Sequence, residues 1–413
     1  MGKRIAALAL AACMALPLFG CGSKLAAQSL TEGVTARTID THIDLTDDST
    51  AVMDFAAALL RQTTKEEGVL LSPVSLLYAL GMTANGAAGT TLSQLEKAMG
   101  MDRDTLNDYL YTYRMSLPEN TKKCKLSLAN SLWVRDIFRV EDSFLDNCVS
   151  YYDAEVYRSA FDEAMKNDLN HWVSKQTDGM IDKLLEQAPG ERTMLYLVNA
   201  VCFDAKWKKP YEKDDIQKGV VFTAADGTRQ TADLLWSQES LYLSDDNTTG
   251  FMKYYDGGRY AFVGLLPNEG VSITDYVAGL TGGKLHALLN DPQHGTVEAA
   301  IPRFKASSSL ELSDALKAMG VTDAFDASRA DLRAMGSAPN DQLYVSAVLH
   351  KTYLSLDENG TKAAAVTAVV NDAGSAEPPE VYRVVLDRPF VYMIVDTHAN
   401  LPLFLGTVTQ MNG

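Results

Sequence analysis

The stretch from Lys351 to Val370 restricts the fold more than any other part of the chain. Residues 351–356 alternate with the two-residue period of a strand, and Asn359-Gly360 then offers the positive φ angles of a tight turn. The run that follows contains no large side chain. One face carries Thr361, Ala363, Ala365, Thr367 and Val369, and the other carries Lys362, Ala364, Val366, Ala368 and Val370. Such a strand can enter a narrow slot without steric clash, but it has no bulky residue to anchor it there.

A polar segment with Pro and Gly, residues 371–380, comes directly after this run and is typical of an exposed loop. By itself the region also fits a simpler interpretation, an ordinary hairpin followed by a surface loop, because an Asn-Gly turn is only a local signal.

The rest of the chain shows helical patterns towards the front and strands towards the back, without an internal repeat. Helices are expected at 51–62, 76–84, 91–99 and within 162–183, and strands at 126–134, 194–203, 260–266 and 297–304. No Pro/Gly/Ser-rich boundary interrupts residues 51–413. We therefore expect one large domain of the α+β class.

The N-terminus has the features of a targeting segment. Lys3 and Arg4 precede an apolar run that is too short to span a membrane, and Leu18-Phe-Gly-Cys21 follows it. We interpret residues 1–21 as a signal peptide with a bacterial lipobox, in which Cys21 carries the lipid; because Phe19 is bulkier than usual there, plain cleavage nearby stays open. Residues 22–48 are expected to be a tether, with the folded domain over 49–413.

Charge and cysteine content exclude several functions. The chain has 53 acidic against 37 basic residues, a net charge of −16, so it would be repelled by nucleic acid and by anionic lipid. Membrane contact is therefore expected through the lipid anchor only. Besides Cys21, we interpret Cys124, Cys148 and Cys202 as mostly buried thiols and expect no disulfide framework.

No catalytic constellation is present, and no metal or cofactor is expected. The chain lacks a Gly-x-Ser-x-Gly elbow, a His-Glu-x-x-His helix and a phosphate-binding loop, and its six histidines show no ligand spacing. Ser72 and Ser75 lie at a Pro-containing helix start, where a capping role is more probable than nucleophilic attack. We therefore do not expect an enzyme.

Several blocks in the same order resemble the serpins. The hinge Leu356-Asp-Glu-Asn-Gly-Thr-Lys-Ala-Ala-Ala-Val-Thr-Ala-Val-Val370 is similar to the family hinge, and residues 387–396 with 403–408 are similar to its C-terminal signature. Further matching blocks are 71–75, 86–90, 126–132, 170–179, 198–207 and 344–351. The resemblance implies a large, mostly antiparallel central sheet, further sheets, eight or nine helices and an exposed reactive-centre loop at about 358–380.

The resemblance also implies roles for individual residues. The hinge residues would be Glu358, Gly360, Thr361, Ala363, Ala364, Ala365 and Thr367. Beneath the central sheet, His350 would bond to Asn199 and to the region of Ser72 and Ser75. Trp207 would lie at the top of the opening, where Arg303 would pair with Glu358. Without the resemblance, His350 and Trp207 fit ordinary core positions equally well.

The implied activity is inhibition of a serine protease by a suicide-substrate mechanism. The protease would cleave the loop and form an acyl-enzyme, and the freed hinge would insert into the central sheet. Counting seventeen positions from Glu358 places the cleaved bond at Gly374-Ser375, with Ala373 and Ala376 as neighbours. No Arg, Lys or large aromatic residue is present there, which favours an elastase-like or subtilisin-like target. The inhibitor is expected to be a monomer, outside the cell or on its surface.

A rival interpretation is a non-inhibitory serpin that serves as a carrier or adhesion module. The small inward-facing set Thr361, Ala363, Ala365 and Thr367 favours inhibition, because non-inhibitory relatives usually carry bulky, charged or Pro residues in the hinge. Lys362 and Val366 depart from the family pattern, and both are expected to point outward on insertion. A hydrolase with unrecognised residues lacks any supporting motif.

Overall fold

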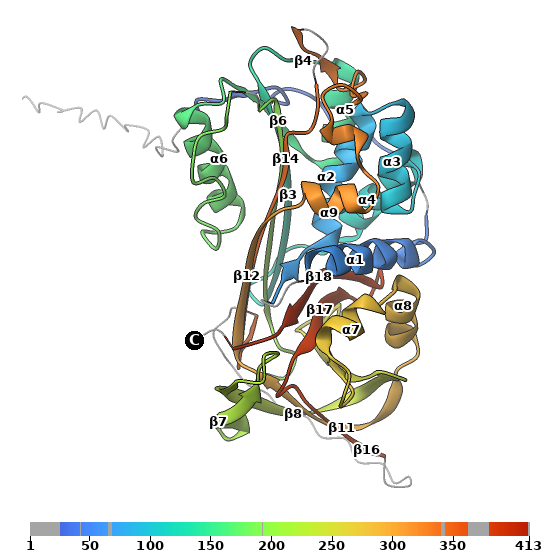
Figure 1. Cartoon of the computed structure of the whole chain (residues 1–413), viewed down its shortest axis with the longest axis vertical. Helices are drawn as coiled ribbons and strands as arrows, with labels where there is room; N and C mark the ends of the chain where they lie inside the picture. Colours follow the sequence, from blue (N-terminus) through green and yellow to red (C-terminus); the bar gives the residue numbers. More distant parts are fainter. Residues whose placement is uncertain are drawn as a thin grey trace, which may run out of the picture.

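The nearly continuous apolar run expected at 194–203 forms strand β6 (Leu195–Lys206), whose first nine residues are all buried. β6 pairs antiparallel with β3 (Cys124–Arg135) from Cys124↔Ala205 to Val134↔Leu195. The computed structural model describes residues 25–41, 43–64, 68–191, 193–339, 343–361 and 380–411. Within these ranges, β6 is the fourth of seven strands in a long sheet, and its side chains are buried because helices cover both faces of the sheet (Figure 1).

This central sheet has seven strands and is mostly antiparallel, as expected. Their order is β1 (Gln28–Ser29), β5 (Glu155–Ser159), β3, β6, β15 (Gly360–Thr361), β14 (Ala347–Asp357) and β12 (Phe304–Glu311). Only β3–β5 and β14–β6 are parallel pairs.

A second sheet of nine strands closes the end of the molecule opposite β4 (Figure 1). It contains β16 (Val381–Val385), β11 (Gln293–Pro302), β8 (Arg229–Asp245), β9 (Thr248–Tyr254), β10 (Tyr260–Pro267), β17 (Phe390–Asp396), β18 (Leu401–Val408) and β2 (Leu70–Leu71), with β7 (Ile216–Thr223) paired to β8. β4 (Arg139–Val140) and β13 (Gly336–Ser337) form a separate pair.

Nine α-helices lie within the described residues. They are α1 (Ser49–Thr63), α2 (Pro73–Gly86), α3 (Gly89–Met99), α4 (Arg103–Ser116), α5 (Asp142–Tyr152), α6 (Glu163–Gln176), α7 (Ile273–Ala278), α8 (Gly282–Asn290) and α9 (Ser313–Ala318). α6 covers one face of the central sheet, and α1 to α5 cover the other (Figure 1). None of these helices is long and apolar enough to cross a membrane.

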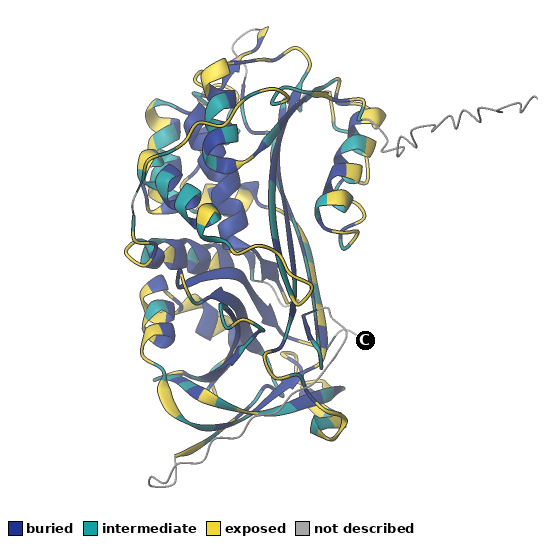
Figure 2. Ribbon diagram, turned by 180° about the vertical axis from the view of Figure 1, so that it is seen from behind, coloured by how far each residue is buried: buried dark blue, intermediate teal, exposed yellow. Residues whose placement is uncertain are grey.

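Helix α2 is buried along its whole length, as the dark ribbon in Figure 2 shows. It starts at Pro73, earlier than the expected Leu76, because a proline at the first helical position needs no hydrogen-bond acceptor for its nitrogen. The first residues of α2 therefore lie directly under the central sheet, beside β14.

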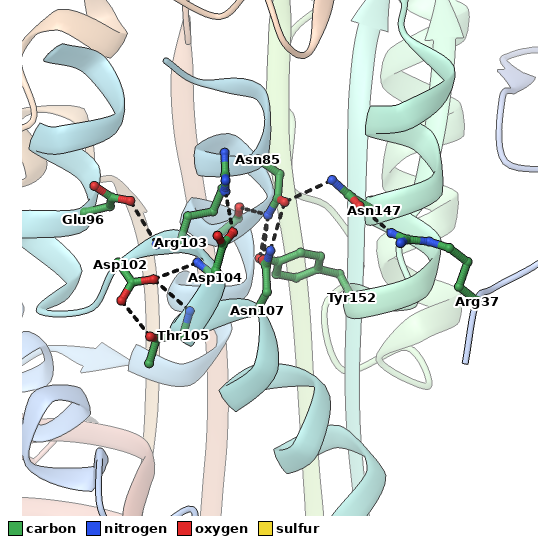
Figure 3. Close-up of polar contacts among 11 residues, drawn as sticks. Arg37, Asn85, Glu96, Asp102, Arg103, Asp104, Thr105, Asn107, Asn147 and Tyr152 are labelled. Atoms are coloured by element: carbon green, nitrogen blue, oxygen red, sulfur yellow. Dashed lines mark hydrogen bonds and ion pairs between the residues drawn. The ribbon is translucent and has the colours of Figure 1, made fainter. Parts of the chain in front are cut away.

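The tether expected at 22–48 is wrong for residues 25–41, because this segment is bound to the body. Gln28 and Ser29 form the edge strand β1 against β5, and the amide of Ala27 donates to Asp168 Oδ2 at 2.7 Å. Arg37 donates to Asn147 Oδ1 at 2.7 Å, and Asn147 in turn donates to Asn85, which is hydrogen-bonded to the buried Asn107 and Tyr152 (Figure 3). A two-residue strand has no readable periodicity, so composition alone suggested a free linker.

Candidate functional site

The hinge is expected at residues 356–370, and its described part, 356–361, enters the central sheet at the end of β6. Gly360 and Thr361 form β15 and pair with Lys206 and Ala205 of β6 on one side, and with the end of β14 on the other. Further along, β6 pairs directly with β14 over residues 196–199 and 347–350. The stretch of β6 between these two pairings, 200–204, marks the path that a longer hinge strand would follow.

Gly360 is required at the entrance to this path. Its φ is +150°, and a Cβ on it would stand 2.1 Å from the carbonyl oxygen of Ala205. A side chain would therefore push the hinge out of the sheet.

Thr361 points into the interior beneath the sheet. It is 1% exposed, and its hydroxyl lies 2.7 Å from the hydroxyl of Tyr255. The Tyr255 ring stacks on Trp207 with centroids 4.3 Å apart. Burial raises the pKa of Tyr255 far above its ordinary value, so its hydroxyl remains a neutral hydrogen-bonding group. The inward orientation of Thr361 agrees with the prediction from the hinge sequence.

Trp207 holds the turn of the hinge through its indole and its backbone. Its Nε1 donates to the carbonyl of Asp357 at 2.9 Å, and its amide donates to the carbonyl of Asn359 at 3.0 Å. The amide of Tyr211 donates to the carbonyl of Glu358 at 2.9 Å. Trp207 therefore lies beside the turn of the hinge, directly after the end of β6.

The predicted contact between Arg303 and Glu358 is confirmed. Arg303 Nη2 lies 2.6 Å from Glu358 Oε2, and Nη1 lies 3.5 Å from Asp233 Oδ2. The Arg303 and Glu358 side chains are 38% and 34% exposed, so solvent screening limits the pair to about 1 kcal/mol or less.

A second group of predicted residues lies further along the same pair of strands. His350 of β14 is 2% exposed, and its Nε2 accepts a hydrogen bond from the amide of Ser72 at 3.0 Å. Burial lowers the pKa of His350 to about 4, so the ring is neutral near pH 7. This neutral nitrogen connects β14 to the start of α2.

His350 and Asn199 do not form the expected side-chain hydrogen bond, although they are opposite each other in the strand register. Asn199 Nδ2 donates instead to Asn130 Oδ1 on β3. Ser72 Oγ, Ser75 Oγ and Asn199 Oδ1 are buried without a hydrogen-bond partner among the described residues. Ser72 occupies the N-cap position of α2 but makes no side-chain capping bond there.

The structure thus brings the predicted residues together in two places, which we call the hinge latch (Trp207, Tyr255, Arg303, Glu358, Thr361) and the buried polar cluster (Ser72, Ser75, Asn130, Asn199, His350). Tyr255 and Asn130 were not identified from sequence, because only the strand register brings them beside Thr361 and Asn199. Ala363, Ala364, Ala365, Thr367, residues 373–376 and Cys21 lie outside the described residues. Cys124, Cys148 and Cys202 form no disulfide within the described residues; the first is half-buried and the others are buried.

Comparisons with known proteins identify the class. Residues 50–411 match the family model "Serpin (serine protease inhibitor)", so the chain belongs to the serpin family. Human serpin B9 is 30% identical over 378 residues, covering 87% of this chain and 98% of the relative. Chicken neuroserpin (Gallus gallus) is 28% identical over 365 residues, covering 84% and 87%.

The similar solved structures are serpins in different states. Tengpin, a thermophilic serpin, in its native state has a TM-score of 0.87 at 39% identity and covers 93% of this chain and 100% of its own. Latent tengpin has a TM-score of 0.78 at 36% identity and covers 92% and 100%. Thyroxine-binding globulin in complex with thyroxine has a TM-score of 0.78 at 25% identity and covers 89% and 100%. The fold described here is therefore closer to native tengpin than to latent tengpin.

Proposed function

We propose that this serpin inhibits serine proteases as a suicide substrate. A protease cleaves the exposed loop and is held as an acyl-enzyme, while the hinge extends into the central sheet between β6 and β14 and carries the protease with it. No residue of the inhibitor acts as a catalyst. Insertion is favourable because the new strand gains backbone pairing on both of its sides.

The position of Gly360 and Thr361 carries this proposal. Gly360 and Thr361 already pair with β6 and β14, and Thr361 already points inward. Because strand side chains alternate, extension in the same register would turn Ala363, Ala365 and Thr367 inward as well. All three are small and uncharged, so the path can close around them without burying a charge.

The cleaved bond in this proposal is Gly374-Ser375, which puts Gly374 in the specificity pocket; cleavage one residue earlier or later would put Ala373 or Ser375 there. Small residues suit the shallow pockets of elastase-like and subtilisin-like enzymes, and no cation is present for a trypsin-like pocket.

The test is to incubate the protein with subtilisin and with pancreatic elastase, and to separate the products in SDS. An inhibitory serpin gives a covalent complex that survives SDS, and mass spectrometry finds a released C-terminal fragment that starts at Gly374, Ser375 or Ala376. Cleavage by both enzymes without any such complex would refute inhibition of these classes.

The rival is a carrier, and the similarity to thyroxine-binding globulin in complex with thyroxine favours keeping it as a second candidate. A carrier would be cleaved in the loop without trapping the protease, so the same experiment distinguishes the two functions.

We also propose that residues 1–21 direct export and that Cys21 is lipidated, with the inhibitor acting outside the cell or on its surface. The support is the basic, apolar and Leu18-Phe-Gly-Cys21 sequence. Cys21→Ser is expected to move the protein from the membrane fraction to the medium, and unchanged fractionation would contradict lipidation.

A further inference from the structure

Residues 25–37, which we call the N-terminal strap, are attached to the body at one end of the central sheet. Leu25 packs against the apolar cluster between α6 and the sheet, and Ala27, only 8% exposed, belongs to that cluster. β1 then pairs with β5, and the amide of Leu30 donates to the carbonyl of Val156 at 2.7 Å. The strap is therefore part of the folded body from Leu25 onward.

The strap crosses from the α6 face of the sheet to the α5 face. Near its start, the amide of Ala27 bonds to Asp168 on α6. At its end, the amide of Arg37 donates to Ser150 Oγ on α5 at 2.9 Å, and the Arg37 guanidinium donates to Asn147. Because the strap is held on both faces, it cannot lengthen the link to the residues that precede it unless these contacts break.

The strand register places the strap at the end of the sheet that is opposite the hinge. Across β5 and β3, Gln28 is level with Leu195, the first residue of β6. Thr361 of the hinge pairs with Ala205, ten residues further along β6, which corresponds to roughly 33 Å. β16, which follows the reactive-centre loop, lies further still in this direction (Figure 1).

A lipid on Cys21 would lie close to the strap. Leu25 is four residues after Cys21, and a chain of this length spans at most about 14 Å. The acyl chains would be buried in the bilayer, so the membrane surface would adjoin the end of the central sheet that carries the strap. This step rests on the lipidation of Cys21 proposed above.

The charge of the body favours an arrangement in which the body stands away from the bilayer. The chain has 53 acidic and 37 basic residues, so an anionic membrane surface repels it. Attachment at one end, together with repulsion along the rest of the body, leaves the opposite end farthest from the membrane.

We infer that the anchored inhibitor holds the strap end of the central sheet at the membrane and presents the reactive-centre loop to the surrounding medium. Its partners are then proteases that are free in the medium, rather than proteases that are anchored in the same membrane. The inference rests on the proposed lipidation and inhibition, and it adds which proteases the loop can reach.

Fluorescence energy transfer measures this orientation. The lipidated protein is inserted into vesicles of phosphatidylethanolamine and phosphatidylglycerol that carry an acceptor dye on the lipid head groups. A donor dye is attached at Glu32→Cys in the strap, or at His294→Cys, whose exposed side chain lies next to the end of the loop. Transfer from position 32 should be several-fold greater than transfer from position 294.

The natural thiols should contribute little to this signal. Burial raises the pKa of Cys124 to about 11, and Cys148 and Cys202 are buried, so all three react slowly with a dye near pH 7. Cys21 is blocked by its lipid. The unsubstituted protein, taken through the same labelling, measures the remaining background.

A longer link to the lipid is the matched control. About forty Gly/Ser residues inserted between Gly22 and Ser23 have an average span of roughly 35 Å and leave the strap unchanged. The body of this variant can turn relative to the membrane, so positions 32 and 294 should give similar transfer.

Kinetics test which proteases reach the loop. The experiment uses whichever of subtilisin and pancreatic elastase forms a covalent complex, either free or bound through a His tag to nickel-chelating lipid in the same vesicles. The free protease should react with the wild type and with the insertion variant at the same rate. The vesicle-bound protease should react several-fold faster with the insertion variant.

The possible outcomes separate the proposals. If mass spectrometry finds no lipid on Cys21, the proposed lipidation is wrong and this inference falls with it. If no covalent complex forms, the inhibitory function is refuted, and energy transfer alone decides the orientation. Equal transfer from the two positions in the wild type overturns only this inference, as do equal rates of the two forms with the vesicle-bound protease.

Discussion

The hinge latch and the buried polar cluster lie along the same pair of strands, but they satisfy their polar groups differently. At the hinge latch, Thr361 meets Tyr255, and Glu358 meets Arg303. In the buried polar cluster, two serine hydroxyls and the Asn199 carbonyl oxygen have no partner among the described residues.

This difference suggests how the sheet can be stable and still ready to open. The atoms without a partner among the described residues lie where β6 and β14 must separate, so opening the sheet there breaks fewer side-chain hydrogen bonds than opening it at the latch. The paired latch opposes that separation at the entrance. We therefore expect variants of the hinge latch to change the rate at which the sheet opens. Variants of the buried polar cluster should change the stability of the closed sheet.

The largest effect is expected for Thr361→Arg. An unpaired charge at this buried position costs several kcal/mol, so the hinge can no longer extend as a strand. The inhibitor should become a cleaved substrate, and its stoichiometry of inhibition should rise many-fold in titrations against the protease. Thr361→Ser keeps the hydroxyl and is the control. Wild-type stoichiometry in Thr361→Arg would show that the inward face does not govern insertion.

The next effect concerns pH and the buried polar cluster. Because the pKa of His350 falls from about 6.5 in the unfolded chain to about 4 in the folded protein, the unfolded state binds the extra proton between these values. Above pH 6.5 this proton does not affect the free energy of unfolding. As the pH falls towards 4, the free energy of unfolding decreases by about 3 kcal/mol. Melting temperatures from pH 8 to 4 should show this loss, and His350→Gln should remove most of it. An identical pH profile in His350→Gln would assign the loss to other groups.

A smaller effect is expected for Tyr255→Phe, which removes the hydroxyl that meets Thr361. The loss of one buried hydrogen bond is worth about 1 kcal/mol, and conversion to the latent form on mild heating should be several times faster. Tyr260→Phe is the matched control, since Tyr260 also packs against Phe203 but its hydroxyl has no partner among the described residues. Equal conversion rates for the two variants would show that the hydrogen bond between Tyr255 and Thr361 does not slow conversion.

The smallest effect is expected for Glu358→Lys. Its pair with Arg303 is worth about 1 kcal/mol or less, but it stands at the entrance to the path. Polymers or latent protein should form slightly faster on mild heating, as measured by native gels. The charge-swapped variant, Glu358→Lys with Arg303→Glu, should recover much of the wild-type behaviour, although Asp233 beside residue 303 limits the recovery. No change in either variant would show that the pair is dispensable.

The sequence predicted the parts of this site that depend on local pattern. The apolar run of β6 and the alternation that turns Thr361 inward are readable from single segments, and the family resemblance added Arg303, Trp207 and His350. The tight turn was expected at Asn359-Gly360 but lies one residue earlier, at Glu358 and Asn359, because Gly360 already pairs with Asp357. The contacts of Tyr255 and Asn130 were not predictable, because they depend on strand register over long separations. The docking of residues 25–41 was missed because a two-residue edge strand has no period.

Hydrogen exchange before and after cleavage of the loop tests hinge insertion most directly. Loop-cleaved protein, prepared with a protease that cuts the loop without being trapped, should show stronger amide protection in β6 at residues 200–204 and in β14 at residues 351–355. Its melting temperature should also rise, because a new strand then pairs with both of these strands. If cleavage leaves the protection of both segments and the melting temperature unchanged, the hinge does not enter the central sheet and the inhibitory mechanism proposed for this serpin is wrong.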